Sequence, residues 1–223
     1  MNKSISTNKI ILSLIGSVVL WTLVTDAWGY SEHFNFNYGE YIYAYLSRLI
    51  WVLPAVLLII RYSNSLYFSS RQCFSRLRFR KPLKIVMIVS LIYAFISMFI
   101  YHRGFWLNKE VNLPLEILKL VLVGFVEETV FRGWGYNALV KVVSDKKAII
   151  ISTIFFILVH WPAYFIKLYR FGTFDILGVI QQSSAALIWG GVCCWLLKRE
   201  KSLWNCIIAH AFYDIVLRLL VGW

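Results

Sequence analysis

Charged side chains are scarce in this chain. Asp, Glu, Lys and Arg make up 15% of its 223 residues, against roughly 25% in an average soluble domain. Hydrophobic residues make up 60%, an excess that a single soluble core cannot bury. Polar, repetitive or low-complexity stretches are also lacking, which excludes a disordered, collagen-like or coiled-coil chain. The composition therefore indicates a multi-spanning membrane protein with short loops.

Cysteine is rare as well. The four cysteines are Cys73, Cys193, Cys194 and Cys206; they form no CxxC pair, and three of them lie in apolar runs. This pattern indicates neither a disulfide framework nor a zinc–thiolate site, so we expect the thiols to be packing residues. The chain also lacks a solenoid-length repeat and a linker rich in Pro, Gly or Ser, and we expect residues 1–223 to form a single transmembrane domain.

Seven apolar runs approach the length of about 20 residues that a helix needs to cross a bilayer. They cover residues 10–28, 41–60, 83–101, part of 113–141, 147–166, 176–197 and 203–222. The first run has no small-residue cleavage site, so we expect a retained span rather than a signal peptide. The predicted fold is all-α, a multi-pass transmembrane helical bundle with about seven spans.

Basic residues outnumber acidic ones by 23 to 11, a net charge of +12. In a membrane protein this excess is explained by cytoplasmic loops, which collect Lys and Arg, so no nucleic-acid partner is expected. The loop between the second and third runs holds seven basic residues, from Arg61 to Lys84, and no acidic one. Smaller basic groups occur at 141–147 and 198–201. We therefore predict a multi-pass cell-membrane protein, embedded in the lipid bilayer, with a cytoplasmic N-terminus and an external C-terminus.

Two adjacent carboxylates, Glu127 and Glu128, interrupt the fourth run and are followed by Arg132. Charged side chains inside a membrane are costly, which makes them candidate functional groups. Neighbouring residues on an α-helix point about 100° apart, so the two carboxylates cannot share one role. Arg132 follows Glu128 at the spacing of one helix face. We expect Glu128 to pair with Arg132 while Glu127 faces another surface; one structural network of all three is the alternative.

Histidines mark two further runs. His160 follows Phe156 by four residues near the end of the fifth run, and His210 precedes Asp214 by four residues in the last one. The second spacing places His210 and Asp214 on one helix face, where the carboxylate can fix the imidazole tautomer. A satisfied interfacial histidine and a structural His–Asp pair are the corresponding non-functional interpretations.

Glu127, His160 and His210 come from three different predicted helices, and one shared polar cavity satisfies them more cheaply than three separate ones. This set suits hydrolysis, because a Glu helped by a His activates water and a second His stabilises the oxyanion. The same three residues could instead hold a divalent metal such as zinc, although HExxH spacing is lacking. The metal question stays open at this level. A single site requires the Glu127 carboxylate to lie within several Å of both histidines.

Three ordered motifs resemble those of the CPBP family, the CAAX-protease and bacteriocin-processing (Abi) membrane peptidases. The motifs are Glu127-Glu128-x-x-x-Arg132, Phe156-x-x-x-His160 and His210-x-x-x-Asp214, within residues 113–218. The resemblance implies a CPBP-like peptidase core in which Glu127 activates water beside His160. His210 and Asp214 would then stabilise the oxyanion, and Glu128, Arg132 and Phe156 would support the site. Eukaryotic relatives have Asn at the position of Asp214, and an acid there would interact differently with an oxyanion.

The resulting functional prediction is an intramembrane endopeptidase acting on a short, membrane-associated or lipidated peptide, of CAAX type or of the type that processes bacteriocins and pheromones. Two other classes are open. One is a non-catalytic immunity or peptide-binding membrane protein that uses the same pocket. The other is a proton-coupled transporter, against which the chain shows no inverted repeat. The intact set of Glu127, His160 and His210 favours the enzyme, because a binding protein does not need all three.

Overall fold

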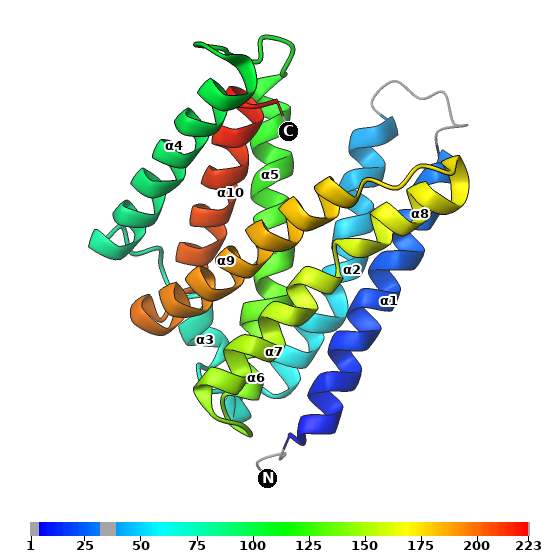
Figure 1. Cartoon of the computed structure of the whole chain (residues 1–223). Coiled ribbons are helices and arrows are strands. Elements are labelled where there is room, and N and C mark those ends of the chain that lie inside the picture. Colours follow the sequence, from blue (N-terminus) through cyan, green and yellow to red (C-terminus); the bar gives the residue numbers. More distant parts are fainter. Residues whose placement is uncertain (1–4, 32–38, 223) are drawn as a thin grey trace.

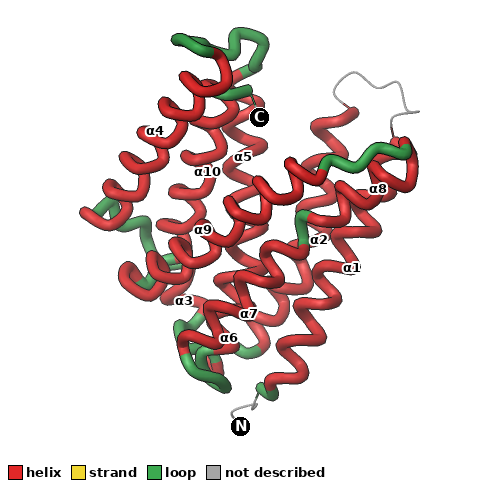
Figure 2. Tube along the Cα trace, viewed as in Figure 1, coloured by secondary structure: helices red, strands yellow, loops and turns green. Residues whose placement is uncertain are grey.

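The computed structural model describes residues 5–31 and 39–222, and these residues form helices joined by short connections (Figures 1 and 2). The long helices are α1 (Thr7–Ser31), α2 (Gly39–Arg61), α4 (Lys81–His102), α5 (Leu113–Glu128), α7 (Asp145–Leu158), α8 (Trp161–Phe171), α9 (Ile176–Glu200) and α10 (Leu203–Leu220). The shorter ones are η1 (Ser63–Ser65), α3 (Ser70–Cys73), η2 (Thr129–Tyr136) and α6 (Asn137–Leu139). The prediction of an all-α bundle is confirmed.

Five helical segments of the described chain are long and apolar enough to cross a membrane: Thr7–Asp26, Lys81–His102, Asp145–Phe171, Ile176–Glu200 and Leu203–Leu220. Large apolar side chains on their surfaces are exposed, such as Leu12, Ile100 and Ile188, as expected where lipid replaces water. The chain is a multi-pass membrane protein. The other two predicted spans correspond to α2 and to α5, which at 16 residues is short for a span by itself.

Helix α5 continues without a break through η2 and α6, and η2 is a π-helix. This segment lies at the centre of the bundle, packed against α10 and α2. All eight residues of η2 are buried, including Arg132. π-Helical turns are rare and occur frequently at functional sites, and this one begins directly after Glu128.

The predicted span at 147–166 lies within one candidate span, Asp145–Phe171, but the helix is interrupted there, because α7 and α8 are separate helices. Helix α7 ends at Leu158, four residues before Pro162, and α8 starts at Trp161. A proline ring clashes with the carbonyl group four residues earlier and cannot donate the backbone hydrogen bond of that turn. The break leaves His160 in the connection between the two helices.

The loops divide the bundle into two ends (Figure 1). At the first, which we call the basic end, α1 begins, and the connections after α2, α6 and α9 carry the basic groups identified in the sequence. Hydrogen bonds join these connections: Ser202 donates to the Ser75 and Arg76 carbonyls, and Lys198 pairs with Asp145 over 2.7 Å. At the second, the opposite end, α5 and α9 begin and α4, α8 and α10 end.

Candidate active site

Glu127 lies between the two histidines that the sequence singled out. Its Oε2 atom is 3.9 Å from His160 Nε2 and 3.8 Å from His210 Nε2. The three side chains come from α5, from the α7–α8 connection and from α10, so the bundle brings together groups that are up to 83 positions apart in the chain. The proximity of the Glu127 carboxylate to both histidines, which a single site requires, is present in the structure.

Glu128 has a different environment from its neighbour and is completely buried. Its Oε1 atom accepts a 2.8 Å hydrogen bond from His210 Nδ1 and lies 3.3 Å from the Arg132 guanidinium. The expected pairing of Glu128 with Arg132 is therefore present. The contact with His210 was not expected, and it joins the ion pair to the group of residues around Glu127.

His210 is enclosed by acidic and aromatic groups. Its Nε2 atom, besides facing Glu127, lies 3.6 Å from Asp214 Oδ2, one turn further along α10. The Trp189 ring lies parallel to the imidazole, with 6.0 Å between ring centres and 7° between planes. Because Nδ1 donates to Glu128, Nε2 is the nitrogen that a substrate or water can reach.

His160 is oriented by the backbone of its own turn. Its Nδ1 atom lies 2.7 Å from the Phe156 carbonyl oxygen. A carbonyl oxygen only accepts hydrogen bonds, so Nδ1 carries the proton, and in the neutral ring Nε2 is an acceptor aimed toward Glu127. The Phe156 ring lies nearly perpendicular to both imidazole rings. The Arg132 guanidinium lies 4.1 Å from the centre of the Phe156 ring.

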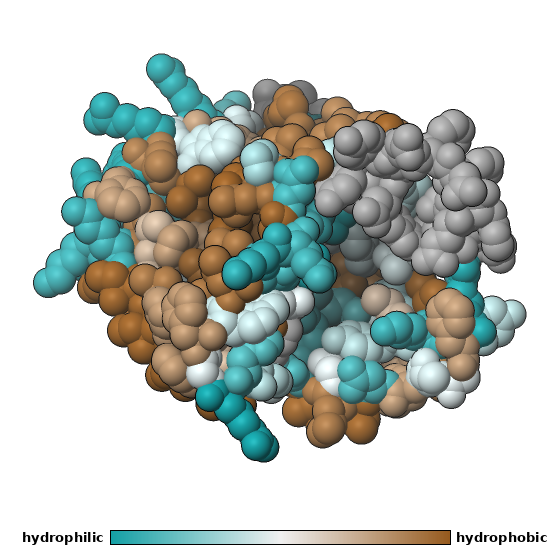
Figure 3. All heavy atoms as spheres, turned by 90° about the horizontal axis from the view of Figure 1, so that it is seen from above, coloured by the Kyte–Doolittle hydropathy of each residue, from teal (hydrophilic) through white to brown (hydrophobic). Residues whose placement is uncertain are grey.

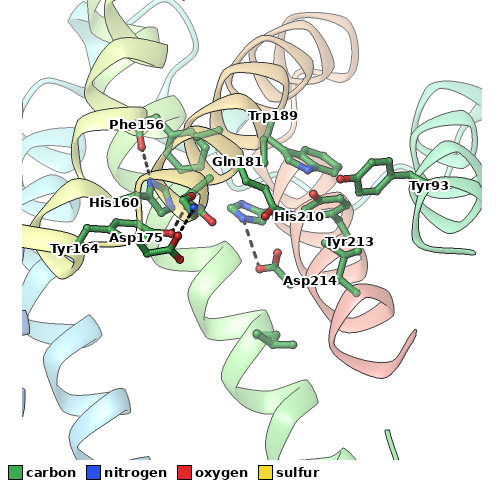
Figure 4. A pocket seen from close by; sticks show the side chains of 16 residues that line it. Tyr93, Phe156, His160, Tyr164, Asp175, Gln181, Trp189, His210, Tyr213 and Asp214 are labelled. Atoms are coloured by element: carbon green, nitrogen blue, oxygen red, sulfur yellow. Dashed lines mark hydrogen bonds and ion pairs between the residues drawn. The ribbon is translucent and has the colours of Figure 1, made fainter. Parts of the chain in front are cut away.

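A cavity of about 490 Å³ adjoins this group of residues (Figure 4). His160, His210 and Asp214 line it, together with Trp189 and Tyr213. Figure 4 shows the labelled side chains converging from α4, α7, α8, α9 and α10. A cavity of this size admits several residues of an extended peptide or a short lipid tail.

Gly124 allows α5 and α10 to approach closely at the site. A Cβ atom at this position would lie 2.9 Å from the Ile207 carbonyl oxygen and 3.3 Å from the Ala211 nitrogen, both backbone atoms. One turn later on α5 come Glu127 and Glu128, which face His210 across the same contact. The glycine therefore sets the separation at which the carboxylates meet the histidine.

The arrangement does not fit one metal ion held by Glu127, His160 and His210. Ligand atoms bound to a zinc ion at roughly 2.0–2.2 Å can be at most about 4.4 Å apart. Among the described residues, the one trio of potential ligands whose atoms all lie within 4.8 Å of one another is Glu128, Cys193 and Cys206. The two histidines flank the Glu127 carboxylate at a wider separation than a shared ion allows.

The trio of Glu128, Cys193 and Cys206 is itself a poor cation site. The carboxylate oxygen of Glu128 already meets Arg132, whose positive charge repels a second cation. Cys206 Sγ donates to the Cys193 carbonyl oxygen over 3.2 Å, which uses the protonated thiol. All four cysteines are free and buried, in agreement with the packing role expected of them.

Several residues of the site were not predicted from the sequence. Trp189 and Tyr213 form part of the cavity wall, with 4.7 Å between their ring centres, and Tyr93 stacks on Tyr213. Aromatic residues make up 17% of the chain, so their presence in an apolar run carried no signal. Asp175 and Tyr164 also line the cavity, but both lie where the sequence predicted only loop or helix end.

The comparison with protein families agrees with this geometry. Residues 109–216 match the family model described as "Type II CAAX prenyl endopeptidase Rce1-like". This segment contains α5, η2, α7, the α7–α8 connection and most of α10, which together supply the acidic and histidine side chains of the site. No curated protein and no solved structure gives a significant match. This match, which covers just under half of the chain, shows a similarity to Rce1-like CAAX prenyl endopeptidases and is consistent with a membrane peptidase of the CPBP family.

Proposed function

We propose that the protein is an intramembrane endopeptidase that hydrolyses a peptide bond in a membrane-associated or short peptide, with Glu127 as the base that activates water. The observation that carries the proposal is the position of the Glu127 carboxylate, less than 4 Å from both His160 Nε2 and His210 Nε2. The match to a protease family makes a peptide bond the expected target.

The distances around Glu127 suit a bound water better than direct hydrogen bonds. At 3.8 and 3.9 Å, its contacts with the histidines are longer than a hydrogen bond. One water oxygen can lie about 2.8 Å from two groups that are this far apart. Such a water would donate one proton to Glu127 and the other to the acceptor nitrogen of His160, which leaves an oxygen lone pair for attack.

The proposed reaction has two steps. In the first, the water oxygen adds to the carbonyl carbon while Glu127 takes its proton, and the carbonyl oxygen becomes an oxyanion. In the second, the C–N bond breaks and the proton passes from Glu127, directly or through His160, to the leaving amine nitrogen. The products are a carboxylic acid and an amine, and the enzyme returns to its starting protonation.

His210 is the proposed donor to the oxyanion. Its Nε2 atom is accessible from the cavity, while Glu128 holds Nδ1. Glu128 and Asp214 stabilise an imidazolium at this position by charge, and a protonated Nε2 can donate to the developing oxyanion. Asp214, as an anion, would itself repel an oxyanion, so its proposed role is to orient and stabilise His210 over 3.6 Å.

Glu127→Gln is the variant that tests the proposal, because it removes the base with little change of shape. Purified wild type and variant would be assayed on short peptides, prenylated CAAX peptides first and unmodified ones beside them. We expect cleavage by the wild type and a loss of roughly 100- to 10,000-fold in the variant, the usual contribution of a general base. Glu110→Gln, which changes an exposed carboxylate outside the site, is the matched control and should leave the rate unchanged.

Two results would contradict the proposal. Undiminished cleavage by Glu127→Gln would remove Glu127 from the mechanism. A wild type that cleaves none of the peptides, while Glu127→Gln retains the effect of the wild type on cells, would favour the non-catalytic immunity or peptide-binding class.

A further inference from the structure

The connection between α3 and α4 contains a basic segment that is held against α10. Residues 75–80, which we call the arginine segment, have the sequence Ser-Arg-Leu-Arg-Phe-Arg and form no helix. Asn205, a buried residue of α10, accepts a 3.0 Å hydrogen bond from the Arg78 nitrogen and donates a 2.7 Å one to the Arg78 carbonyl oxygen. Ser202 donates to two further carbonyl oxygens of the segment. Both residues bind main-chain atoms, so they hold the segment independently of its arginine side chains.

The side chains of the arginine segment combine positive charge with apolar surface. Arg76 and Arg80 are exposed and Arg78 is half-buried. Within the described chain, no ion pair joins any of the three to a carboxylate. The residues between them, Leu77 and Phe79, are 42% and 57% exposed. The segment therefore presents guanidinium groups and large apolar side chains side by side.

The connection between α9 and α10 adds positive charge next to this segment. Arg199 and Lys201 are exposed, and the Lys201 carbonyl oxygen accepts a 3.5 Å hydrogen bond from the Ser75 hydroxyl. Figure 1 shows the two connections beside each other, below α4. Glu200, the acidic residue between Arg199 and Lys201, is buried. One basic surface, which we call the arginine surface, is thus formed by Arg76, Arg78, Arg80, Arg199 and Lys201.

The arginine surface lies at the ends of three candidate spans. The arginine segment ends directly before Lys81–His102, and the second connection joins Ile176–Glu200 to Leu203–Leu220. The ends of spans lie at the membrane surface, where lipid head groups meet acyl chains. At the opposite end, the connection between α4 and α5 carries both charge signs, and hydrophilic residues lie in separate groups among apolar ones (Figure 3). The concentration of positive charge is therefore a feature of the basic end.

We propose that the arginine surface binds the head groups of anionic phospholipids, while Leu77 and Phe79 insert among the adjoining acyl chains. A guanidinium binds a phosphate through two parallel hydrogen bonds, and basic clusters beside a span attract anionic lipids. The exposed apolar residues favour lipid over a soluble acidic partner, because acyl chains cover them at the membrane surface.

The charge bias that orients membrane proteins does not explain this arrangement. That bias depends on the number of Lys and Arg residues in a loop. It requires neither a backbone held by two buried side chains, Ser202 and Asn205, nor large apolar residues between the arginines. Both features suit a binding surface, because binding costs less when the contacting groups are already ordered.

Thermal unfolding of the purified full chain in a neutral detergent tests the proposal. Phosphatidylglycerol and phosphatidylcholine with the same acyl chains would be added at equal mole fractions. A ligand that binds only the folded protein stabilises it, so we expect phosphatidylglycerol to raise Tm by about 3 °C more than phosphatidylcholine. Salt at about 0.5 M should remove most of this difference by screening the charges. Equal Tm values in the two lipids would overturn the proposal.

The variant Arg76→Gln/Arg80→Gln locates the effect on the arginine surface. Both side chains are exposed and the contacts with Asn205 and Ser202 do not involve them, so we expect the variant to fold and its lipid difference to fall by roughly half or more. The matched control is Lys146→Gln/Lys147→Gln, which removes two exposed charges from the start of α7 at the same end and should keep the difference.

Two further outcomes would overturn the proposal. Equal losses in the two variants would show that the lipid responds to net charge and not to the arginine surface. Glycerol phosphate, a water-soluble head group without acyl chains, should leave Tm unchanged; the same rise with this compound would assign the surface to a soluble anion. These measurements need no peptide cleavage, so their outcome is independent of the proposed function.

Discussion

His210 Nδ1 donates a 2.8 Å hydrogen bond to Glu128 Oε1, the oxygen that also lies 3.3 Å from the Arg132 guanidinium. Both carboxylates of the Glu127–Glu128 pair therefore face the same imidazole, one at each nitrogen. Glu127 and Glu128 therefore have different roles. Glu128 fixes the ring and is shielded from solvent, whereas Glu127 faces the free nitrogen and is partly exposed, with 13% of its side chain accessible.

Replacing Glu128 by Gln should destabilise the protein and reduce cleavage together. The amide can still accept from His210, but the Arg132 charge, fully buried, loses its counter-ion. Breaking a buried pair from one side costs about 3–5 kcal/mol. Thermal unfolding in detergent would show a lower Tm.

The double variant Glu128→Gln/Arg132→Met is the matched control, since it removes both charges. It should recover most of the lost Tm while cleavage stays low, because His210 then lacks its anionic partner. If the single variant unfolds at the wild-type temperature, the ion pair does not stabilise the fold.

Replacing His160 by Asn should impair turnover with little effect on stability. The Asn amide can replace Nδ1 as donor to the Phe156 carbonyl, but nothing replaces Nε2, which faces Glu127 over 3.9 Å. We expect kcat to fall by roughly 100-fold or more, as for loss of an acid–base group, with Tm close to the wild-type value. A variant that raises KM alone would assign His160 to binding instead of proton transfer.

Gly124→Ala should separate α5 from α10 and reduce both stability and cleavage. The added Cβ would meet backbone atoms of Ile207 and Ala211, which cannot rotate away. Overpacking of this kind costs about 1–3 kcal/mol. Gly191→Ala is the control, because a Cβ there meets nothing within 4 Å, and alanine is the better helix former. Equal Tm values for both variants would show that the α5–α10 contact tolerates a methyl group.

The sequence predicted those parts of the structure that follow from the cost of polar groups in an apolar medium. Charges that must avoid lipid converge, which is why Glu127, His160 and His210 could be placed in one site before the fold was known. Helix type and helix breaks depend on packing. The π-helix after Glu128 carries no propensity signal, and the break at His160 could have been read only from Pro162, four residues after Leu158.

The orientation of side chains was harder to predict than their proximity. Helical spacing paired Glu128 with Arg132, yet the same carboxylate reaches His210 on another helix. Such contacts depend on how α5 and α10 cross, which is decided by a close approach at Gly124. Likewise, Trp189 became recognisable as part of the site only through its parallel position beside His210.

Chelators should leave the rate of cleavage unchanged. The Glu127 carboxylate lies between two imidazoles that are too far apart to share one ion. In the trio of Glu128, Cys193 and Cys206, the positive charge of Arg132 beside Glu128 repels a metal ion. The proposed base, Glu127, and the proposed oxyanion donor, His210, are protein groups, so removing divalent metals should not slow the reaction. Cleavage would be measured after incubation with EDTA and with 1,10-phenanthroline, beside a zinc protease that loses activity in the same detergent. A loss of activity restored by added zinc would show that the histidines move together to bind an ion, and would replace Glu127 with a metal as the activator of water.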